Sequence, residues 1–182
     1  GSSPQDIVTG LDGALWFTNT GNDTIGRVTR LTLNIRDPLE RGLVWPQKLR
    51  VAFGYPAGVR EVPVSVTANT ARVTGTARMP RPLYILPNGA GLGYGLFILD
   101  GNSRQYLLAH LEDIPDPLTR GSAWVTLWDN LLESQFTPGE FLDLVVRALP
   151  RESDEQNIQR VLGYATRAFW GRLPVDERAA RV

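Results

Sequence analysis

The sequence contains no cysteine and only one histidine, His110. Without cysteine there is no disulfide, no thiol nucleophile, no thiolate metal site and no iron–sulfur cluster. A zinc hydrolase built on an H-E-x-x-H helix needs two histidines, and a Ser-His-Asp triad needs a histidine supported by other groups. These absences exclude most of the common hydrolase designs.

Net charge and long apolar runs are also missing. The 182 residues include 19 Lys and Arg against 19 Asp and Glu, so no bulk field attracts nucleic acid or an anionic membrane. No apolar run approaches the roughly 20 residues that span a bilayer, and no signal segment opens the chain. We therefore expect no nucleic-acid partner and no membrane partner. Residues 1–3 are expected to be the remnant of a cleaved tag.

The composition that remains, 42% hydrophobic and 21% charged residues, is that of a globular protein with one domain or two small ones. Up to about Leu99 the sequence predicts short strands. Alternating apolar residues mark strands at 31–35, 49–53 and 62–66, and apolar runs at 83–86 and 96–99 predict strands buried on both sides. The glycine-rich stretch 88–95 predicts a hairpin between two of these strands. This part is expected to be an antiparallel β-sandwich.

After Asp100 the apolar period changes to that of helices. The sequence predicts a helix at 103–111, a second capped by Asp116, a third opened by the capping box of Thr137 and Glu140, and a fourth opened by Ser153 and Gln156. A fifth helix is expected to start at Pro174. Because the connections are short, the helices should form antiparallel α-helical hairpins, as in helical repeats. The fold class is therefore α+β, a β-sandwich followed by helical hairpins.

His110 is the first candidate for catalysis, since it lies near the end of the first predicted helix beside two carboxylates. No second histidine supports it, and we interpret it as a helix-end or surface histidine. Paired carboxylates could act without histidine, as in glycoside hydrolysis. The carboxylates of the helical part occupy caps or exposed helix positions, which favours a solvated helix surface: Asp113, Asp116, Asp129, Glu133 and Glu140.

Two further patterns favour structure over chemistry. The glycines of 88–95 precede a strand-like run, whereas a nucleotide loop needs a helix there. Of the five tryptophans, Trp124 and Trp128 lie at helical spacing among apolar residues, and we expect most of the five to lie in the core. We therefore assign no catalytic, cofactor-binding or metal-binding residue, and we expect no cofactor.

Three stretches carry a resemblance to a known family. Leu43–Val51 (LVWPQKLRV) is similar to the W-x-hydrophobic-P-L strand in the β-sandwich of zinc aminopeptidases of the aminopeptidase N family. Leu86–Asp100 is similar to the strand N-x-x-x-x-G-Y-Y-R-V-x-Y-D that ends this sandwich. Asp116–Leu132 is similar to the first helices of the family's helical domain. From Arg27 to its end, the chain resembles the C-terminal half of these enzymes.

The resemblance implies a non-catalytic role. The family's H-E-x-x-H helix and G-x-M-E-N loop lie in a preceding catalytic domain, and neither motif occurs in this sequence. No catalytic residue can be transferred. The resemblance implies a sandwich spacer and a truncated helical cap, whose partner is the missing catalytic domain of a parent zinc aminopeptidase. We expect that this chain alone neither binds zinc stoichiometrically nor cleaves aminoacyl substrates.

The stretch Ile7–Val28 resembles one blade repeat of the streptogramin B lyase β-propellers. One blade cannot close a propeller, so the segment is a fusion, a chimera or a chance likeness, and its strands should pair with the sandwich or with another chain. The predicted divisions are residues 4–26 (blade-like strands), 27–100 (β-sandwich) and 101–182 (helical domain).

Two alternatives remain beside the structural role. The first is a self-standing binding or assembly module in which the blade-like strands mediate association; a lyase is the least favoured. We also expect a homo-oligomer, because apolar residues extend far round the helix at 138–149 and a covering layer is expected to be missing.

Overall fold

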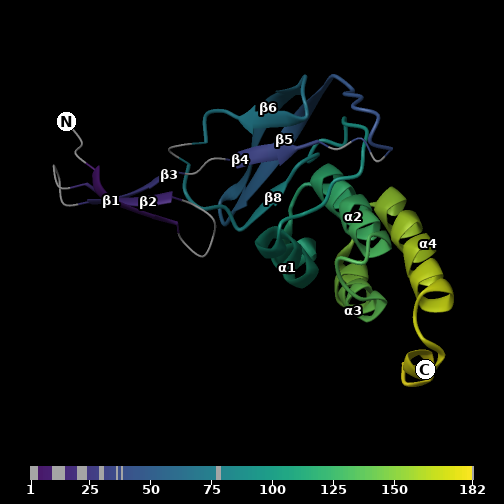
Figure 1. The fold of residues 1–182 in the computed structure, drawn as a ribbon. Helices are drawn as coiled ribbons and strands as arrows, with labels where there is room; N and C mark the ends of the chain where they lie inside the picture. The colour runs from purple at the N-terminus through teal and green to yellow at the C-terminus, as the bar shows by residue number, and fades with distance from the viewer. Residues whose placement is uncertain are drawn as a thin grey trace. The chain divides into compact units, whose positions relative to one another are not determined.

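The computed structural model describes residues 4–9, 15–19 and 24–28 by their backbone, and residues 31–35, 37, 39–76 and 79–181 with their side chains. The described part is α+β, with antiparallel strand pairs before five α-helices (Figure 1), and this confirms the predicted fold class. Its contacts form two compact units. One combines Gly1–Gln47 with Val62–Arg81, and the other combines Lys48–Glu61 with Pro82–Val182.

The first unit holds two antiparallel sheets. Strands β1 (Pro4–Thr9), β2 (Leu15–Asn19) and β3 (Thr24–Val28) pair in that order. Strand β4 (Leu31–Asn34) pairs with β7 (Thr70–Val73). The blade-like segment therefore pairs within itself in the part that the structure describes. Its side chains lie outside the described part of the structure.

A further sheet has the order β6-β5-β8, with β5 (Gln47–Tyr55) between β6 (Gly58–Val66) and β8 (Tyr84–Leu86). Strand β5 is buried on both faces from Val51 to Gly54. Gly54 is required because a Cβ there would lie 2.0 Å from the Tyr84 ring. The strands predicted at 31–35, 49–53, 62–66 and 83–86 are thus confirmed.

The strand predicted at 96–99 is wrong. Residues 92–99 form an irregular segment, in which Leu96 is 53% and Ile98 45% exposed. The glycine-rich stretch before it is correspondingly a loop and not a hairpin between strands. The physical reason is that the backbone of 97–99 hydrogen-bonds to the side chain of Asn130, in the helix 117–132, and not to a strand.

The helices are α1 (Gly101–His110), α2 (Pro117–Leu132), α3 (Pro138–Ala148), α4 (Glu155–Gly171) and α5 (Val175–Ala179). Asp116 caps α2 as predicted, and Thr137 forms the predicted capping box at α3. At α4 the prediction is wrong by one residue, because Asp154 accepts the cap hydrogen bond. None of the described helices combines the length and hydropathy needed to cross a bilayer.

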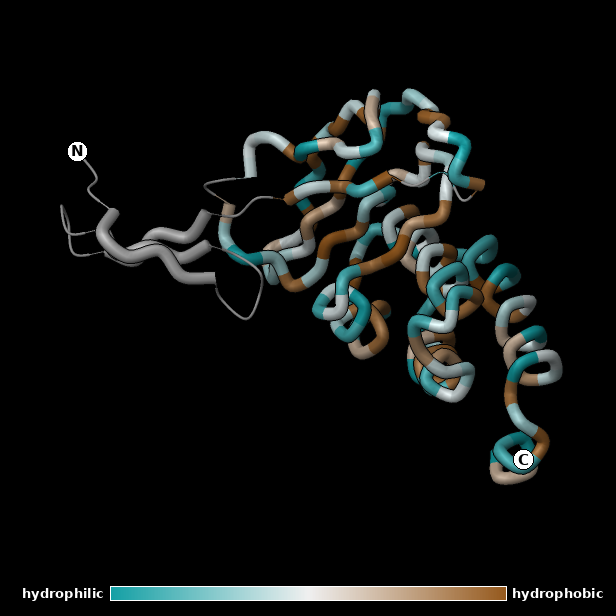
Figure 2. The backbone as a smooth tube through the Cα atoms, viewed as in Figure 1, coloured by the Kyte–Doolittle hydropathy of each residue, from teal (hydrophilic) through white to brown (hydrophobic). Residues whose placement is uncertain are grey.

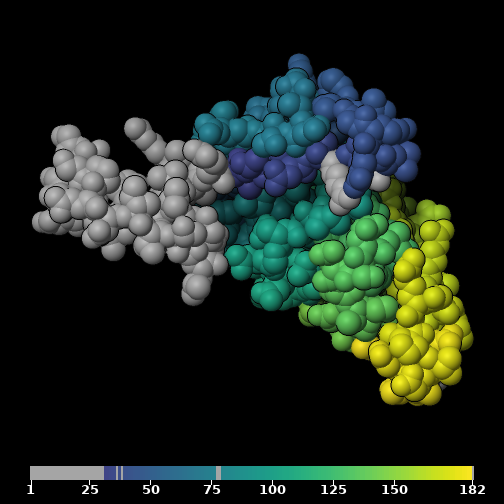
Figure 3. Space-filling view, in the orientation of Figure 1, coloured from purple at the N-terminus to yellow at the C-terminus, as the bar shows by residue number. Residues whose placement is uncertain are grey.

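Helices α1 to α4 bury a core that is continuous with β8. Trp124 and Trp128 lie in it as predicted, whereas Trp45 is 51% and Trp170 68% exposed. Hydrophobic and hydrophilic segments alternate along the helices (Figure 2). In Figure 3, α3 (green) lies against α4 (yellow), and the two helices are in contact.

Helix α3 does not expose the second apolar side that the sequence predicts. Phe141, Leu142, Leu144 and Val145 are all buried, and only Val146 is largely exposed. The reason is that α1 packs on α3 as well as α4. The expected homo-oligomer therefore loses this support and stays a prediction.

Candidate functional site

The glycine-rich loop after β8 is held closed by the side chain of Asn88. Its amide accepts a hydrogen bond from the Gly93 N–H (2.8 Å) and donates one to the Gly93 carbonyl (3.0 Å). A Cβ at Gly93 would lie 2.1 Å from Leu49 Cδ2, and one at Gly89 would lie 2.4 Å from the Ala52 Cβ. The glycines therefore allow the loop to approach β5, which explains this composition by packing.

The chain then passes along α2 and enters α1. Asn130 is fully buried, accepts a hydrogen bond from the Leu99 N–H (3.0 Å) and donates one to the Phe97 carbonyl (2.7 Å). One side-chain amide thus replaces the neighbouring strand that residues 97–99 would otherwise need. Asp100 caps α1 by accepting a hydrogen bond from the Ser103 N–H (3.0 Å).

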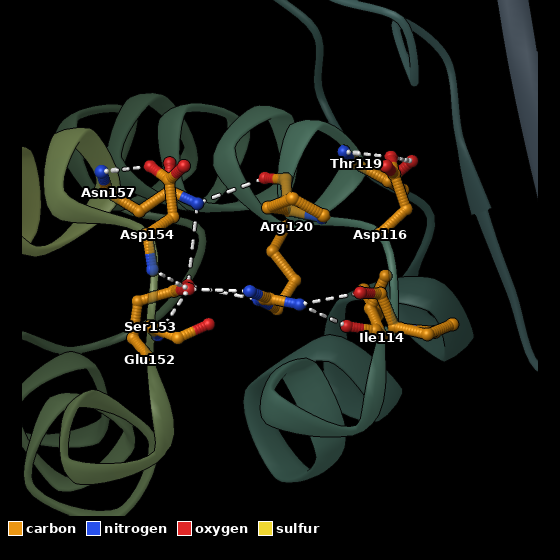
Figure 4. A network of polar contacts seen from close by, with 10 residues as sticks. Ile114, Asp116, Thr119, Arg120, Glu152, Ser153, Asp154 and Asn157 are labelled. Atoms are coloured by element: carbon orange, nitrogen blue, oxygen red, sulfur yellow. Dashed lines mark hydrogen bonds and ion pairs between the residues drawn. The ribbon is translucent and has the colours of Figure 1, made fainter.

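Arg120, on α2, forms a buried ion pair with Glu152, which precedes α4 (Figure 4). The guanidinium Nε and Nη2 donate to the two carboxylate oxygens at 3.0 and 2.6 Å, and Nη1 donates to the carbonyls of Ile114 (2.8 Å) and Pro115 (2.9 Å). The two charged side chains are only 10% and 2% exposed. This network connects the turn before α2 to the turn before α4.

The Glu152 carboxylate also accepts hydrogen bonds from the backbone. It accepts hydrogen bonds from the next two backbone N–H groups at 3.0 and 3.1 Å. Burial raises the pKa of Glu152. Hydrogen bonds from Arg120 and the backbone together lower it by more than burial raises it, so the pKa lies below its ordinary value. Asn157 connects α4 to α2 by donating to the Pro117 carbonyl (3.0 Å). The network is saturated, so it offers a stable junction and no spare acid or base.

His110 lies at the end of α1, beside a pocket of about 210 Å³ that three tyrosines also line. The centroid of its ring lies 4.9 Å from that of Tyr106, with the two rings tilted by 34°, and the Tyr106 ring stacks on Tyr84 at 5.6 Å. His110 Nδ1 is 3.4 Å from a carboxylate oxygen of Asp113, which also pairs with Arg151 at 3.2 Å. Burial raises the pKa of Tyr84 to about 12, so its hydroxyl stays protonated near neutral pH. The described lining contains no serine, threonine or lysine nucleophile.

A groove of about 880 Å³ runs along α2. The loop segment 88–97 lines the groove, and residues at the start of α4 line it too, among them Asp154 and Arg160. The face of α2 in the groove carries apolar, small and acidic residues: Leu118, Gly121, Ser122, Val125, Thr126, Asp129, Leu132 and Glu133. This face lies beside the buried stripe of α2, so the helix has one side for the core and one for the groove.

Of the carboxylates considered from the sequence, Asp129 and Glu133 both line the groove along α2, whereas the others lie elsewhere. Asp116 caps α2 and Glu140 completes the capping box of α3, whereas Asp113 pairs with His110. No group of three or more His, Asp or Glu side chains that could hold a metal ion occurs in the described residues. The zinc that the resemblance implies for a parent enzyme therefore finds no ligand set among them.

Arg120 and Asn130 are important residues that sequence reasoning did not single out. Arg120 lies four residues before Trp124 on the stripe of α2 that faces the core, and Asn130 lies between Leu127 and Leu131 on it. A single polar residue on an otherwise apolar stripe is a signal of a buried hydrogen-bond network. The partner, such as Glu152, could not be found in this way because it is 32 residues distant.

No protein family model matches the chain. Over 100 residues the chain is 28% identical to an aminopeptidase N of Streptomyces lividans. This stretch is 55% of the present chain and 11% of that protein, so the chain matches a small part of its relative. The finding supports a loose aminopeptidase-like relationship. Neither finding supports the resemblance of Ile7–Val28 to a propeller blade.

Proposed function

We propose that this chain is a non-catalytic portion of an aminopeptidase N-like metallopeptidase, which supports and covers the catalytic domain. The observation that carries this proposal is the structural use of Leu86–Asp100, the stretch that resembles the family's sandwich-ending motif. Asn88 closes the loop on Gly93, Gly93 provides the close approach to β5, and Asp100 caps α1. The residues shared with the motif therefore act in folding.

A rigid connection between sheet and helices suits a supporting role. Asn130 joins α2 to the segment 97–99 before α1, the Arg120–Glu152 pair joins α2 to the turn before α4, and Asn88 closes the loop after β8. These hydrogen bonds are buried or partly buried, which holds their geometry closely. In this proposal the helices present a fixed surface to the catalytic domain, and zinc chemistry belongs to that domain.

The proposal is tested with two preparations. The purified chain, supplied with zinc, should not hydrolyse leucine p-nitroanilide. The second preparation is Streptomyces lividans aminopeptidase N truncated before the stretch that matches this chain. Adding the chain in trans should bind this truncated enzyme and raise its activity or thermal stability. Zinc-dependent hydrolysis by the chain alone would contradict the non-catalytic role, and absence of any effect in trans would contradict the covering role.

The second candidate is a self-standing binding module. It is favoured by the groove along α2, which has the size and the mixed lining of a ligand site. A saturable ligand of the chain alone, with no effect on the truncated peptidase, would favour this candidate.

A further inference from the structure

The groove along α2 exposes several apolar side chains. Leu118 is 62% and Leu96 53% exposed, and both line the groove. Leu92, 72% exposed, belongs to the same loop. Single exposed apolar residues are ordinary, but several on the rim of one groove mark an interaction surface.

Two acidic side chains of the groove, Asp129 and Glu133, have no basic partner among the described residues. Asp129 and Glu133 are four residues apart, where like charges repel. They lie in the last turn and at the C-cap of α2, where the helix dipole is already negative and no basic residue is present. In the part of the chain that the structure describes, neither carboxylate has an ion-pair partner. Burial and the charge of Glu133 both raise the pKa of Asp129.

This arrangement costs stability in the isolated chain and attracts a cation. The groove lining has three carboxylates, Asp129, Glu133 and Asp154, against one guanidinium, that of Arg160. Asp154 is already engaged as the cap of α4. A basic side chain entering the groove would relieve the repulsion and offset the helix dipole at once.

The length of the groove fits a short extended segment. From Leu118 to Glu133, which both line the groove, the helix is about 22 Å long at 1.5 Å per residue. An extended segment of about seven residues, at 3.3 Å each, matches this length.

We propose that the groove binds an extended polypeptide segment in which a Lys or Arg lies between apolar residues. The apolar side chains pack on Leu96, Leu118 and Val125, and the basic group binds Asp129 and Glu133. A second copy joined groove to groove is disfavoured, because it brings two acidic pairs together. The inference does not depend on the proposed peptidase role.

The test uses two fluorescein-labelled peptides of seven residues and the full chain. The first alternates valine and threonine around a central arginine, and the second has glutamate in place of arginine. In fluorescence polarisation the arginine peptide should bind saturably and at least tenfold more tightly than the glutamate peptide. Its affinity should fall as salt increases, because the carboxylates are partly exposed.

Variants identify the groove as the binding site. The double variant D129N/E133Q should lose the arginine preference and unfold at the same temperature as the native chain or higher, since it removes a repulsion. L96S should weaken both peptides equally. The matched controls are V146S, an exposed apolar residue of α3, and E155Q, an exposed carboxylate of α4; both lie outside the groove lining and should bind as the native chain does.

Three results would overturn the proposal. The first is absence of saturable binding by either peptide. The second is equal affinity for both peptides, or an arginine preference that persists in D129N/E133Q. The third is a dimer in sedimentation that L96D dissociates and the arginine peptide does not displace, which would assign the groove to a second copy of the chain.

Discussion

Replacing Arg120 by alanine should strongly destabilise the helical part. The guanidinium makes four hydrogen bonds, two to Glu152 and two to the carbonyls of Ile114 and Pro115. Its loss leaves a carboxylate that is 2% exposed without its counter-ion. Removing one partner of a buried ion pair costs about 3–5 kcal/mol, mostly because the other charge stays buried.

The loss of unfolding free energy can be measured by urea unfolding, and the drop in Tm by thermal unfolding, both followed by circular dichroism. For a chain of this size about 1 kcal/mol lowers Tm by about 3 °C, so Arg120→Ala should melt about 9–15 °C below the native chain. Arg50 offers a matched control, since its pair with Glu61 is 57% and 33% exposed. Arg50→Ala should therefore cost less than about 1 kcal/mol.

A double replacement separates the buried charge from lost packing. Arg120→Met with Glu152→Leu removes both charges, so it should be more stable than Arg120→Ala by about 1–2 kcal/mol. If Arg120→Ala costs no more than the Arg50 control, or if the double variant is less stable than the single one, the reasoning about this network is refuted.

The effect of pH has a definite sign. The pKa of Glu152 is lowered in the fold from its ordinary value of 4.5, so its contribution is present above about pH 4.5 and is lost as pH falls through the lower folded pKa. In Arg120→Ala burial acts without the guanidinium and favours the protonated carboxyl. The difference in unfolding free energy between native chain and variant should therefore shrink as pH falls below about 4.5.

Three further outcomes are expected. Asn130→Ala should cost about 2–4 kcal/mol in urea unfolding, because a buried N–H and a buried carbonyl of 97–99 lose their partner; a loss below 1 kcal/mol would mean that water replaces the amide. Trp124→Phe should change stability by no more than about 1 kcal/mol, since the buried Nε1 of Trp124 has no partner among the described residues. Tyrosinate absorbance should show late titration, because burial raises the pKa of Tyr55, Tyr84, Tyr106 and Tyr164, that of Tyr84 to about 12 from 10.0. Stability should fall as pH rises from 10 toward 12, and Tyr84→Phe should reduce both effects.

The helix starts could be predicted because the interactions that make them are local. An N-cap side chain bonds to a backbone N–H two or three residues later, so Asp116 and the box of Thr137 and Glu140 were recognisable from spacing alone. At α4 two such patterns overlap within adjacent residues, and the structure uses Asp154 in place of Ser153. Spacing does not decide between neighbouring caps, since both satisfy the same local rule.

The strands could be predicted where a strand partner exists and not elsewhere. Residues 83–86 and 96–99 are both continuous apolar runs, but only the first run pairs in a sheet. The difference is Asn130 on α2, which takes up the backbone groups of 97–99. An apolar run predicts that a segment is buried or extended, whereas pairing depends on which element lies next to it.

The sequence by itself determined the α+β class, the caps of α2 and α3, the core tryptophans of α2 and the absence of thiol or two-histidine chemistry, because each depends on composition or on neighbours within about four residues. Only the tertiary structure decided that Arg120 meets Glu152, that α1 covers α3, and that Asp129 and Glu133 line a groove with the loop of Asn88. These contacts join residues about 30 to 45 positions apart. Packing selects them by burying apolar surface, and side chains that no sequence period relates become neighbours as a result.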